Sequence, residues 1–189
     1  MIRIGILGNI GSGKSYVAKN FRYPVFNADY EVSKLYKKDK KIFKKLKKKL
    51  PKHITSFPIN KNEITKAILS NKVNLKKIII IVHLEIRKLL KLFLKKNRNK
   101  KVIILDIPLL LENKINNKND ILVFVDSKKI EIEKRLKKRP NFNRKLFNKF
   151  KKIQFKSSYK KKNSHYVIKN NFTKKNIKRD INNILSKIL

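Results

Sequence analysis

IRIGILGNIGSGKSYVAKNF, residues 2–21, is the stretch of the sequence that decides the fold. Its first part, residues 2–7, is a short apolar and β-branched run that ends at Gly8, a pattern typical of a buried parallel strand. Residues 15–21 predict a helix. Between the two, residues 8–15 (GNIGSGKS) match the phosphate-binding pattern G-x-x-x-x-G-K-[ST] in full. Strand, loop and helix thus follow one another in the order that this pattern requires.

The residue types in this phosphate loop (residues 8–15) suit a nucleotide. Glycines let the backbone wind tightly and turn its N–H groups inward, and the helix that follows adds the positive end of its dipole. Lys14 can reach the β- and γ-phosphates, and the Ser15 hydroxyl can bind Mg²⁺. The alternative, a glycine-rich turn with a chance Lys-Ser pair, does not explain the flanking elements. We expect ATP to bind at Gly11, Ser12, Gly13, Lys14, Ser15 and Tyr16, with Mg²⁺ as cofactor.

Strand and helix patterns alternate along the rest of the chain. Further strands are predicted at residues 24–26, 102–107, 121–125 and 166–168. Helices are predicted at residues 29–37, 37–52, 64–69, 75–94, 140–163 and 174–188, with one more that runs to about residue 139 after a cap at Asp126 and Ser127. This alternation predicts an α/β fold, a parallel sheet of about five strands with helices on both faces.

Lysine dominates the composition. The 189 residues carry 52 Lys and Arg against 12 acids, a net charge of +40, and 44 of the 52 are Lys. Ile, Leu, Val and Phe still number 67, well above the roughly 20% of disordered chains, so the chain can fill a core. The lysines indicate either drift towards A/T-rich codons, which we favour, or nucleic-acid binding, which would concentrate Arg and aromatic residues. In both cases we expect nonspecific attraction of polyanions.

Other features narrow the class of protein. The chain has no cysteine, which excludes disulfides, thiolate metal sites and cysteine nucleophiles. His53, His83 and His165 show no metal-ligand spacing; His83 lies in an apolar helical pattern and faces either the core or a substrate. Charges interrupt the longest apolar region, residues 78–94, and the first residues lack a signal-peptide pattern. We expect a soluble, cytoplasmic protein, not a membrane protein; the oligomeric state stays open, with a monomer favoured.

Three acidic residues lie at or after the ends of predicted strands, where ligands of doubly wound sheets bind. Asp29 could accept a proton from an acceptor hydroxyl or hold Mg²⁺ through water, or it could cap the next helix. Asp106 could bind Mg²⁺ or serve as a structural acid at a strand end. Glu112 is a weaker candidate of the same kind.

Two arginines stand out in a chain that otherwise prefers lysine. Arg135 and Arg139 are four residues apart and so share one helix face. The planar guanidinium binds phosphate oxygens in a bidentate manner, so both are candidates to clamp the transferring phosphate. The alternative is a surface ion pair with Glu131, which suits Arg135 better than Arg139.

Together with further motifs, these residues resemble the dephospho-coenzyme A kinase family over nearly the whole length of the chain. The phosphate loop is shared by many families, whereas PLLLE in the right place is far more specific. The segments similar to the family's motifs are ILGNIGSGKS (6–15, with Gly8 onward as the loop), NAD (27–29), INK (59–61) with Ile64, His83, LDIPLLLE (105–112), Arg135 with Arg139, Gln154, and YVI (166–168) with Asn170.

The resemblance implies transfer of the ATP γ-phosphate to the ribose 3′-hydroxyl of dephospho-CoA, the last step of CoA synthesis. Asp29 would then be the general base, Arg139 the lid arginine that neutralises phosphate charge, and Lys61 and His83 would lie towards the dephospho-CoA pocket. One kinase domain, residues 1–189, would comprise a core (about 1–30, 100–139 and 164–189), a helical acceptor-binding part (about 30–100) and a helical lid (about 140–163).

Five positions depart from the family pattern. Leu84 replaces the Pro that follows the family's His, Lys61 replaces an Arg, and Tyr16 stands where Thr usually follows the loop Ser. Ile132 replaces a Gln, and His165 replaces the Asp before YVI. Lys61 keeps a charge but loses the bidentate fork, which predicts weaker acceptor binding.

Other functions stay open on the sequence. A different small nucleoside or nucleotide kinase would share this fold, and exchanging the acceptor in one assay separates the two. An RNA-binding ATPase would show RNA-stimulated ATP hydrolysis and a steep salt dependence of RNA binding, but the chain lacks a clustered Arg and aromatic platform. A decayed, inactive relative would not be expected to keep an intact phosphate loop.

Overall fold

The computed structural model describes residues 1–140 and 142–189, with the backbone alone at Lys174. Asn141, part of the segment expected as a lid, lies outside the described residues. The chain forms two compact units. The first unit consists of Met1–Asn27, Asn97–Asn143 and Phe147–Leu189, and the second of Ala28–Lys96 with Arg144–Leu146.

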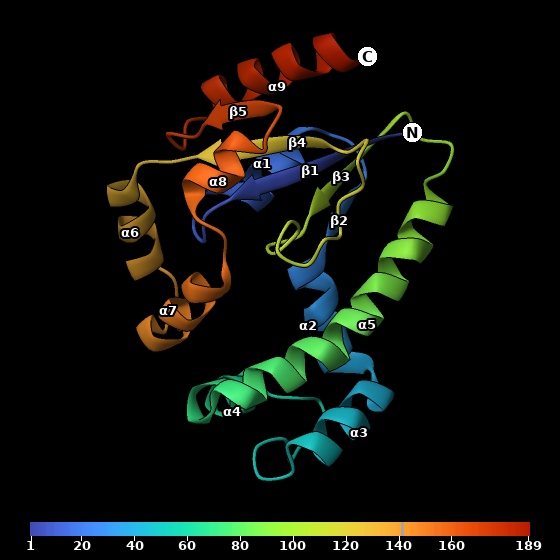
Figure 1. The fold of residues 1–189 in the computed structure, drawn as a ribbon, viewed down its shortest axis with the longest axis vertical. Helices are drawn as coiled ribbons and strands as arrows, with labels where there is room; N and C mark the ends of the chain where they lie inside the picture. The colour runs from blue at the N-terminus through green and yellow to red at the C-terminus, as the bar shows by residue number, and fades with distance from the viewer. Residues whose placement is uncertain (141) are drawn as a thin grey trace. The chain divides into compact units, whose positions relative to one another are not determined.

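A five-stranded parallel sheet forms the centre of the first unit (Figure 1). Its strands are β1 (Ile2–Gly8), β2 (Val25–Asn27), β3 (Val102–Asp106), β4 (Ile121–Asp126) and β5 (Tyr166–Lys169). They lie in the order β2-β3-β1-β4-β5, and every neighbouring pair is parallel. The α/β class and the number of strands expected from the sequence are thus confirmed.

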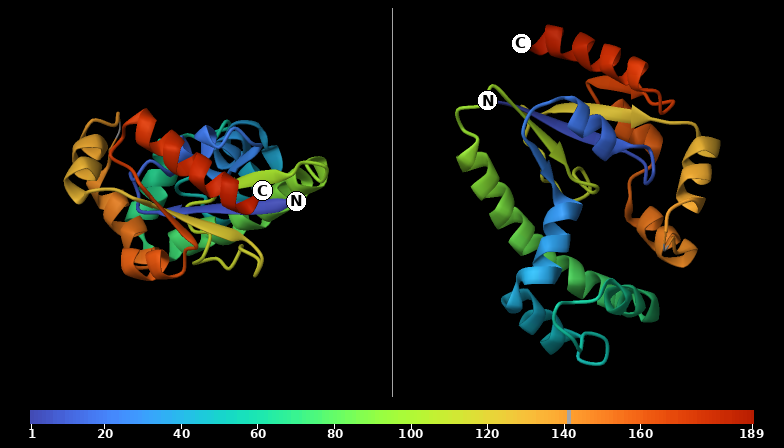
Figure 2. Two further views of the ribbon diagram at one scale, coloured as in Figure 1. Left: turned by 90° about the horizontal axis from the view of Figure 1, so that it is seen from above. Right: turned by 180° about the vertical axis from the view of Figure 1, so that it is seen from behind.

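Both faces of the sheet are covered, because alternate residues of each strand point to opposite sides. On one face, Ile4 and Ile6 of β1 join a buried cluster with residues of α1 (Lys14–Asn20) and α9 (Lys174–Ile188). On the other face, Gly5 lies so close to Leu110 that a methyl group at residue 5 would overlap it. The helix α8 (Ser157–Lys162) packs against β1. Figure 2 shows α1 and α9 from behind, on the side turned away from the viewer in Figure 1.

Four helices make up the second unit: α2 (Ala28–Lys38), α3 (Lys40–Lys49), α4 (Lys61–Ser70) and α5 (Lys72–Lys96). The long helix α5 packs against the other three. Its buried residues recur every three or four positions and so form one face of the helix: Leu75, Ile78, Val82, Ile86 and Leu90. Over the described residues, no helix is long and apolar enough to cross a membrane.

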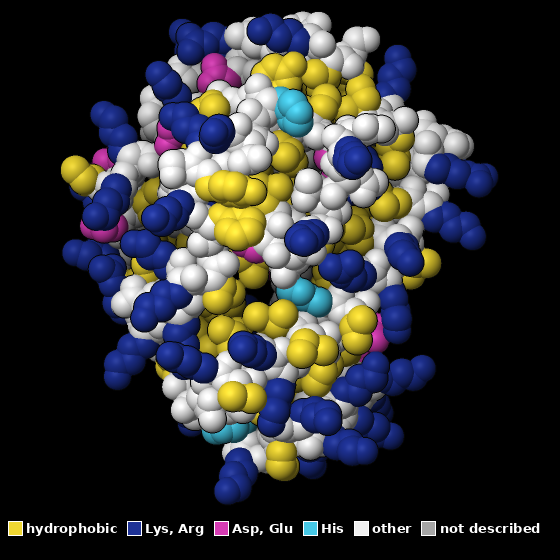
Figure 3. Space-filling view, viewed as in Figure 1, with side chains coloured by type: hydrophobic (Ala, Val, Ile, Leu, Met, Phe, Trp, Pro, Cys, Tyr) yellow, Lys and Arg dark blue, Asp and Glu magenta, His cyan; other side chains and the backbone are white. Residues whose placement is uncertain are grey.

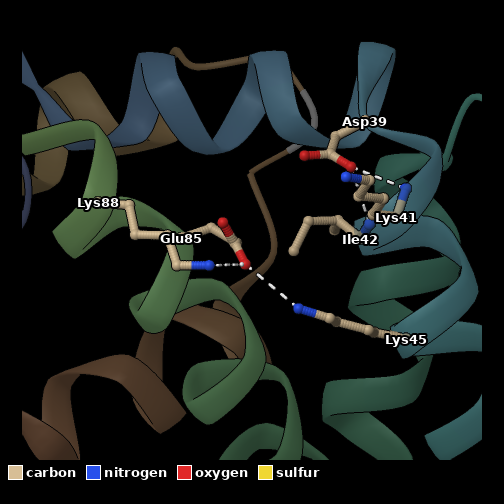
Figure 4. Close-up of polar contacts among 6 residues, drawn as sticks. All are labelled: Asp39, Lys41, Ile42, Lys45, Glu85 and Lys88. Atoms are coloured by element: carbon tan, nitrogen blue, oxygen red, sulfur yellow. Dashed lines mark hydrogen bonds and ion pairs between the residues drawn. The ribbon is translucent and has the colours of Figure 1, made fainter. Parts of the chain in front are cut away.

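Polar contacts tie α3 to its surroundings in this unit (Figure 4). Asp39 Oδ1 accepts hydrogen bonds from the backbone N–H groups of Lys41 (2.8 Å) and Ile42 (3.0 Å), so Asp39 is the N-cap of α3. Glu85 of α5 accepts from Lys45 of α3 at 3.2 Å and from Lys88 at 3.1 Å. One carboxylate therefore links two helices.

Helix boundaries differ from the sequence prediction at three places. The helix predicted at 37–52 is shorter in the structure: residues 37 and 38 belong to α2, and α3 runs from Lys40 to Lys49 after its N-cap at Asp39. The expected helix at 140–163 contains two helices, α7 (Arg144–Ile153) and α8. The cap expected at Asp126 and Ser127 is wrong: Asp126 belongs to β4, and α6 (Lys129–Lys137) begins after Lys128 without a side-chain cap.

Candidate active site

The phosphate loop leaves the carboxyl end of β1 and enters α1 through glycines in left-handed conformations. Gly11 has a φ of +87° and Gly13 a φ of +89°, values that other residues adopt only with strain. A Cβ at Gly11 would come within 3.0–3.1 Å of Ile132 and Leu136 on α6. The close approach of α6 to the loop therefore requires a glycine there.

Two side chains that directly follow β4 and β5 hold the backbone of the phosphate loop in place. The carbonyl oxygen of Ser12 accepts hydrogen bonds from Ser127 Oγ at 2.9 Å and from Asn170 Nδ2 at 2.7 Å. Asn170 is buried and lies directly after β5. The hydroxyl of Ser12 is also buried, and it makes no hydrogen bond in the described structure. These contacts fix the backbone of the loop against β4 and β5.

Lys14 lies folded back over the loop. Its ammonium donates to the carbonyl oxygens of Gly8 at 3.2 Å and Asn9 at 2.9 Å, which keeps a positive charge at the place where the backbone turns. Ser15 and Tyr16 follow in the first turn of α1 and are exposed. The loop thus offers a positive charge and hydroxyl groups in one short segment.

Asp106 lies on the same edge of the sheet. It ends β3, is 3% exposed, and is paired in register with Asn27 at the end of β2. The Asn27 side-chain amide donates a hydrogen bond to Asp106 Oδ2 at 2.5 Å. In the described part of the chain, no group of three or more His, Asp and Glu residues could hold a metal ion. An ion at this edge would therefore need ligands from the nucleotide and water, as Mg²⁺ commonly does.

The two arginines differ in their surroundings. Arg135, within α6, stacks its guanidinium over the ring of Phe172 at 4.1 Å. The ion pair considered for it is not formed, since Glu131 pairs with Lys134 instead. Arg139 follows the end of α6 and is exposed, and its backbone N–H donates to the carbonyl of Leu136. Its side chain belongs to the segment that leads into α7.

Glu112 has a structural partner. Its Oε1 forms an ion pair with Lys160 Nζ at 3.1 Å and accepts from the backbone N–H of Phe155 at 2.9 Å. The weak expectation of a metal role for Glu112 is therefore replaced by a buried contact with α8.

The other predicted residues belong to the second unit. Asp29 lies in the first turn of α2, two residues after β2, and is exposed; a carboxylate is favourable at this end of a helix. Lys61 begins α4 and is exposed. His83 is half-buried in α5, and burial, reinforced by the nearby charge of Arg87, lowers the pKa of its imidazole. His83 is therefore neutral at neutral pH.

The described structure divides the predicted site residues between the two units. The phosphate loop, Tyr16, Asp106 and Arg139 belong to the first unit, and Asp29, Lys61 and His83 to the second. Sequence reasoning missed the contacts made by Ser127 and Phe172. For Phe172 the sequence offered one signal, its place next to the YVI-x-N segment. No spacing rule links Phe172 to Arg135, which it contacts.

Solved structures share this architecture. The chain is similar to TT1252 from Thermus thermophilus, with a TM-score of 0.78, 26% identity, and coverage of 100% of this chain and 98% of that one. It also resembles the dephospho-CoA kinase from Campylobacter jejuni, with a TM-score of 0.65, 17% identity, and coverage of 98% and 96%. A shikimate kinase from Bacteroides thetaiotaomicron matches at a TM-score of 0.52 and 13% identity over 98% and 97% of the two chains. The last two likenesses show a P-loop kinase fold.

Sequence comparisons are more specific. The dephospho-CoA kinase from Wolbachia sp. subsp. Brugia malayi (strain TRS) is 30% identical over 190 residues, covering 98% of this chain and 97% of its own. The dephospho-CoA kinase from Rickettsia bellii (strain RML369-C) is 31% identical over 193 residues, covering 100% and 98%. The family model for dephospho-CoA kinase matches residues 2–176. With the phosphate loop at the end of β1 and a match over nearly all of its length, this chain belongs to the dephospho-CoA kinase family.

Proposed function

We propose that this chain transfers the γ-phosphoryl group of ATP to the ribose 3′-hydroxyl of dephospho-CoA, forming coenzyme A and ADP as the final step of CoA biosynthesis. The observation that carries this proposal is the complete loop GNIGSGKS at the carboxyl end of β1, in a chain that the dephospho-CoA kinase family model matches over residues 2–176. The loop supports ATP as donor, and family membership supports the acceptor.

Positioning and charge neutralisation supply most of the rate in such a reaction, because the protein does little covalent chemistry. Lys14 would place its ammonium on the β- and γ-phosphates in place of the loop carbonyls that it contacts now. The other loop residues and Tyr16 would surround the phosphates. Arg139 would add a second positive charge from the lid as charge moves on to the leaving oxygen.

The acceptor side of the reaction is assigned to the second unit. Asp29 would accept the proton of the 3′-hydroxyl, a role that its exposed carboxylate permits. Lys61 would contact an anionic group of dephospho-CoA. His83 would bind the acceptor as a neutral imidazole, because burial lowers its pKa.

Mg²⁺ is the cofactor that we propose to accompany ATP. The Ser15 hydroxyl and the Asp106 carboxylate would hold it, since both are hard oxygen donors, and Asp106 ends β3, the strand next to β1. Bound there, the ion would neutralise charge on the phosphates. Asn27 keeps the Asp106 carboxylate in place through its hydrogen bond.

We further propose how the parts of the chain divide these tasks. The core would bind ATP, residues of about 30–100 the acceptor, and about 140–163 would act as a lid that excludes water. We also propose that the chain acts as a monomer. The use of ATP supports a cytoplasmic location.

The experiment that tests this function incubates purified protein with Mg-ATP and dephospho-CoA and follows CoA and ADP by mass spectrometry. We expect stoichiometric CoA and ADP, and a fall of about 10²- to 10³-fold in kcat for Lys14→Ala. Lys19→Ala, a change of an exposed lysine on the same helix α1, is the matched control and should keep its turnover.

Parallel assays separate the alternatives. AMP and shikimate replace dephospho-CoA as acceptors, and RNA is added without an acceptor. Turnover with another acceptor alone would indicate a different small-molecule kinase, and ADP release only with RNA would indicate a nucleic-acid-dependent ATPase. Near-normal turnover of Lys14→Ala would remove Lys14 from the mechanism.

A further inference from the structure

A buried ion pair joins α8 to the segment after β3, in a place that the proposed reaction does not use. Lys160 of α8 is 2% exposed and Glu112, in the segment after β3, is 8% exposed, with 3.1 Å between Nζ and Oε1. Among the lysines whose side chains the structure describes, Lys160 is the buried one. Burial of an ammonium is unfavourable unless it is paired, so this lysine differs in kind from the many on the surface.

Residues 154–157, just before Lys160, make three more polar contacts with other parts of the first unit. The backbone N–H of Phe155 donates to Glu112 Oε1 at 2.9 Å, and Gln154 Nε2 donates to the carbonyl of Pro108 at 3.3 Å. Ser157 Oγ donates to Asn9 Oδ1 at 2.8 Å. Residues 154–160 are therefore attached both to the segment after β3 and to the phosphate loop.

Asn9 connects this attachment to the phosphate loop and to Lys14. Its side chain accepts from Ser157, and its carbonyl oxygen accepts from the Lys14 ammonium at 2.9 Å. A shift of residues 154–160 would thus move a neighbour of Lys14. Because misplacement by about 1 Å can reduce turnover about 10²-fold, such a link has kinetic consequences.

The opposite end of the proposed lid also rests on the loop. Ile132 and Leu136 of α6 lie within van der Waals reach of Gly11, just before Arg139. Residues just before Arg139 therefore contact the phosphate loop by apolar packing, and Ser157, after α7, contacts it by a hydrogen bond. The polar contacts of residues 154–157 depend on the ion pair between Glu112 and Lys160.

We propose that Glu112, Lys160 and Ser157 are positioning residues for phosphoryl transfer: they anchor the carboxyl end of the lid to the phosphate loop. Glu112 and Lys160 fix residues 155–160, and Ser157 carries that position to Asn9. This inference rests on the proposed function, because it takes residues 140–163 as the lid of a kinase.

Substitution of the buried lysine tests the anchor against a neighbouring pair. Lys160→Met keeps an unbranched side chain that is one heavy atom shorter, and it removes the charge. Lys161→Met is the matched control, because Lys161 also lies on α8 and pairs with a carboxylate, Asp126, at 2.9 Å, yet is 51% exposed. Exposed pairs of this kind contribute little to stability.

We expect Lys160→Met to lower kcat about 10-fold or more while the KM for ATP stays within about twofold, and Lys161→Met to leave both near wild type. The exchange rate of the Phe155 amide proton, measured by NMR relative to Ile104 in the central strand β3, should rise in Lys160→Met and not in Lys161→Met. A lysine that served folding alone would lower the melting temperature without lowering kcat in the folded protein.

A second variant keeps the test decisive if Lys160→Met does not fold. Ser157 is exposed, so Ser157→Ala should fold, and we expect it to lower kcat by about threefold or more with little change in KM. Unchanged kcat in the variant measured, an equal fall in Lys161→Met, or unchanged exchange at Phe155 in Lys160→Met would each overturn the anchor. The exchange measurement needs no acceptor. If the wild type forms no CoA, the proposed function fails on that result, and Phe155 exchange alone then decides the anchor.

Discussion

Asp29 is the residue whose proposed role is easiest to separate from binding. It lies in the first turn of α2 and is exposed, whereas the phosphate loop belongs to the first unit. If Asp29 accepts the proton of the 3′-hydroxyl, Asp29→Asn should lower kcat about 10²- to 10⁴-fold and leave ATP affinity unchanged. Steady-state kinetics with an ATP titration measure both.

A matched change is available in the same helical turn. Glu31→Gln removes a carboxylate that pairs with Lys34 at 3.1 Å, so it alters the charge of α2 equally without touching Asp29. It should keep wild-type kcat. Similar losses in the two variants would mean that the charge of the helix matters, and near-normal turnover of Asp29→Asn would exclude Asp29 as the base.

We expect the carboxyl of Glu63 to make the stability of the second unit depend on pH. Burial acts to raise the pKa of its carboxyl, but hydrogen bonds from Thr55 and Ser56 outweigh burial and lower it. A carboxyl whose pKa is depressed on folding stabilises the protein above its unfolded pKa of about 4.3 and loses this effect as the pH falls through the folded value. Thr55 donates through both its backbone N–H and its hydroxyl, the latter at 2.6 Å.

Urea unfolding as a function of pH checks this expectation. Glu63→Gln should be less stable than wild type at neutral pH, and the difference in the free energy of unfolding should shrink as the pH drops below about 4.3. Thr55→Val removes one of the hydrogen bonds and should weaken the pH dependence in part. A difference that is constant with pH would show that the Glu63 charge does not contribute.

At the scale of elements, the sequence predicts best where the signal is local. The apolar run of β3 and the amphipathic pattern at 174–188 correspond to Val102–Asp106 and Lys174–Ile188 in the structure. The helix predicted at 37–52 is present as Lys40–Lys49, but its bounds differ, because the carboxylate of Asp39 caps the helix two residues after its predicted start. Apolar periodicity locates the buried face of a helix better than it locates the ends of the helix.

The site shows the same division between local and distant signals. The phosphate loop could be predicted because its eight residues are contiguous and because the residue types that the pattern fixes each have a chemical role in binding phosphate. Ser127 could not be placed, because its hydroxyl donates to the Ser12 carbonyl, 115 positions away along the chain. A Ser before a helix ordinarily predicts a cap, and tertiary contact overrides that preference here. The pairing of Glu112 with Lys160 is likewise invisible to spacing rules.

The contribution of the N-cap of α3 to stability can be tested directly. The helix carries Lys at seven of its ten positions, so its first turn has no acidic residue of its own and depends on Asp39 to accept from two backbone N–H groups. Asp39→Ala should lower the free energy of unfolding by about 1 kcal/mol, whereas Asp39→Asn, which keeps an acceptor, should lower it less.

Urea or thermal unfolding of the two variants measures the difference. Figure 4 shows both hydrogen bonds that Asn could retain in part and Ala could not. Equal stability of Asp39→Ala and wild type would mean that α3 is held by the burial of Ile42 and Leu46 alone.

For the whole molecule, charge is the dominant long-range term. Twelve acids cannot neutralise 52 Lys and Arg, and Figure 3 shows the cationic side chains spread over all of the visible face with few acids between them. Such a surface repels itself in the folded state more than in the expanded unfolded chain. Because the Debye length falls from about 30 Å at about 0.01 M salt to about 8 Å at about 0.15 M, added salt should relieve this repulsion.

The melting temperature should therefore rise as NaCl is increased over that range, the opposite of a protein held by exposed ion pairs. Chloride is the suitable anion, because phosphate and sulfate would also bind the phosphate loop. A variant with Lys44, Lys47 and Lys48 of α3 changed to Gln has less charge to screen, so its melting temperature should depend less on salt. None of these lysines takes part in the ion pair of Lys45 with Glu85, which therefore stays intact. A melting temperature that is flat or falls with NaCl would show that the self-repulsion of the +40 charge does not limit the stability of this fold.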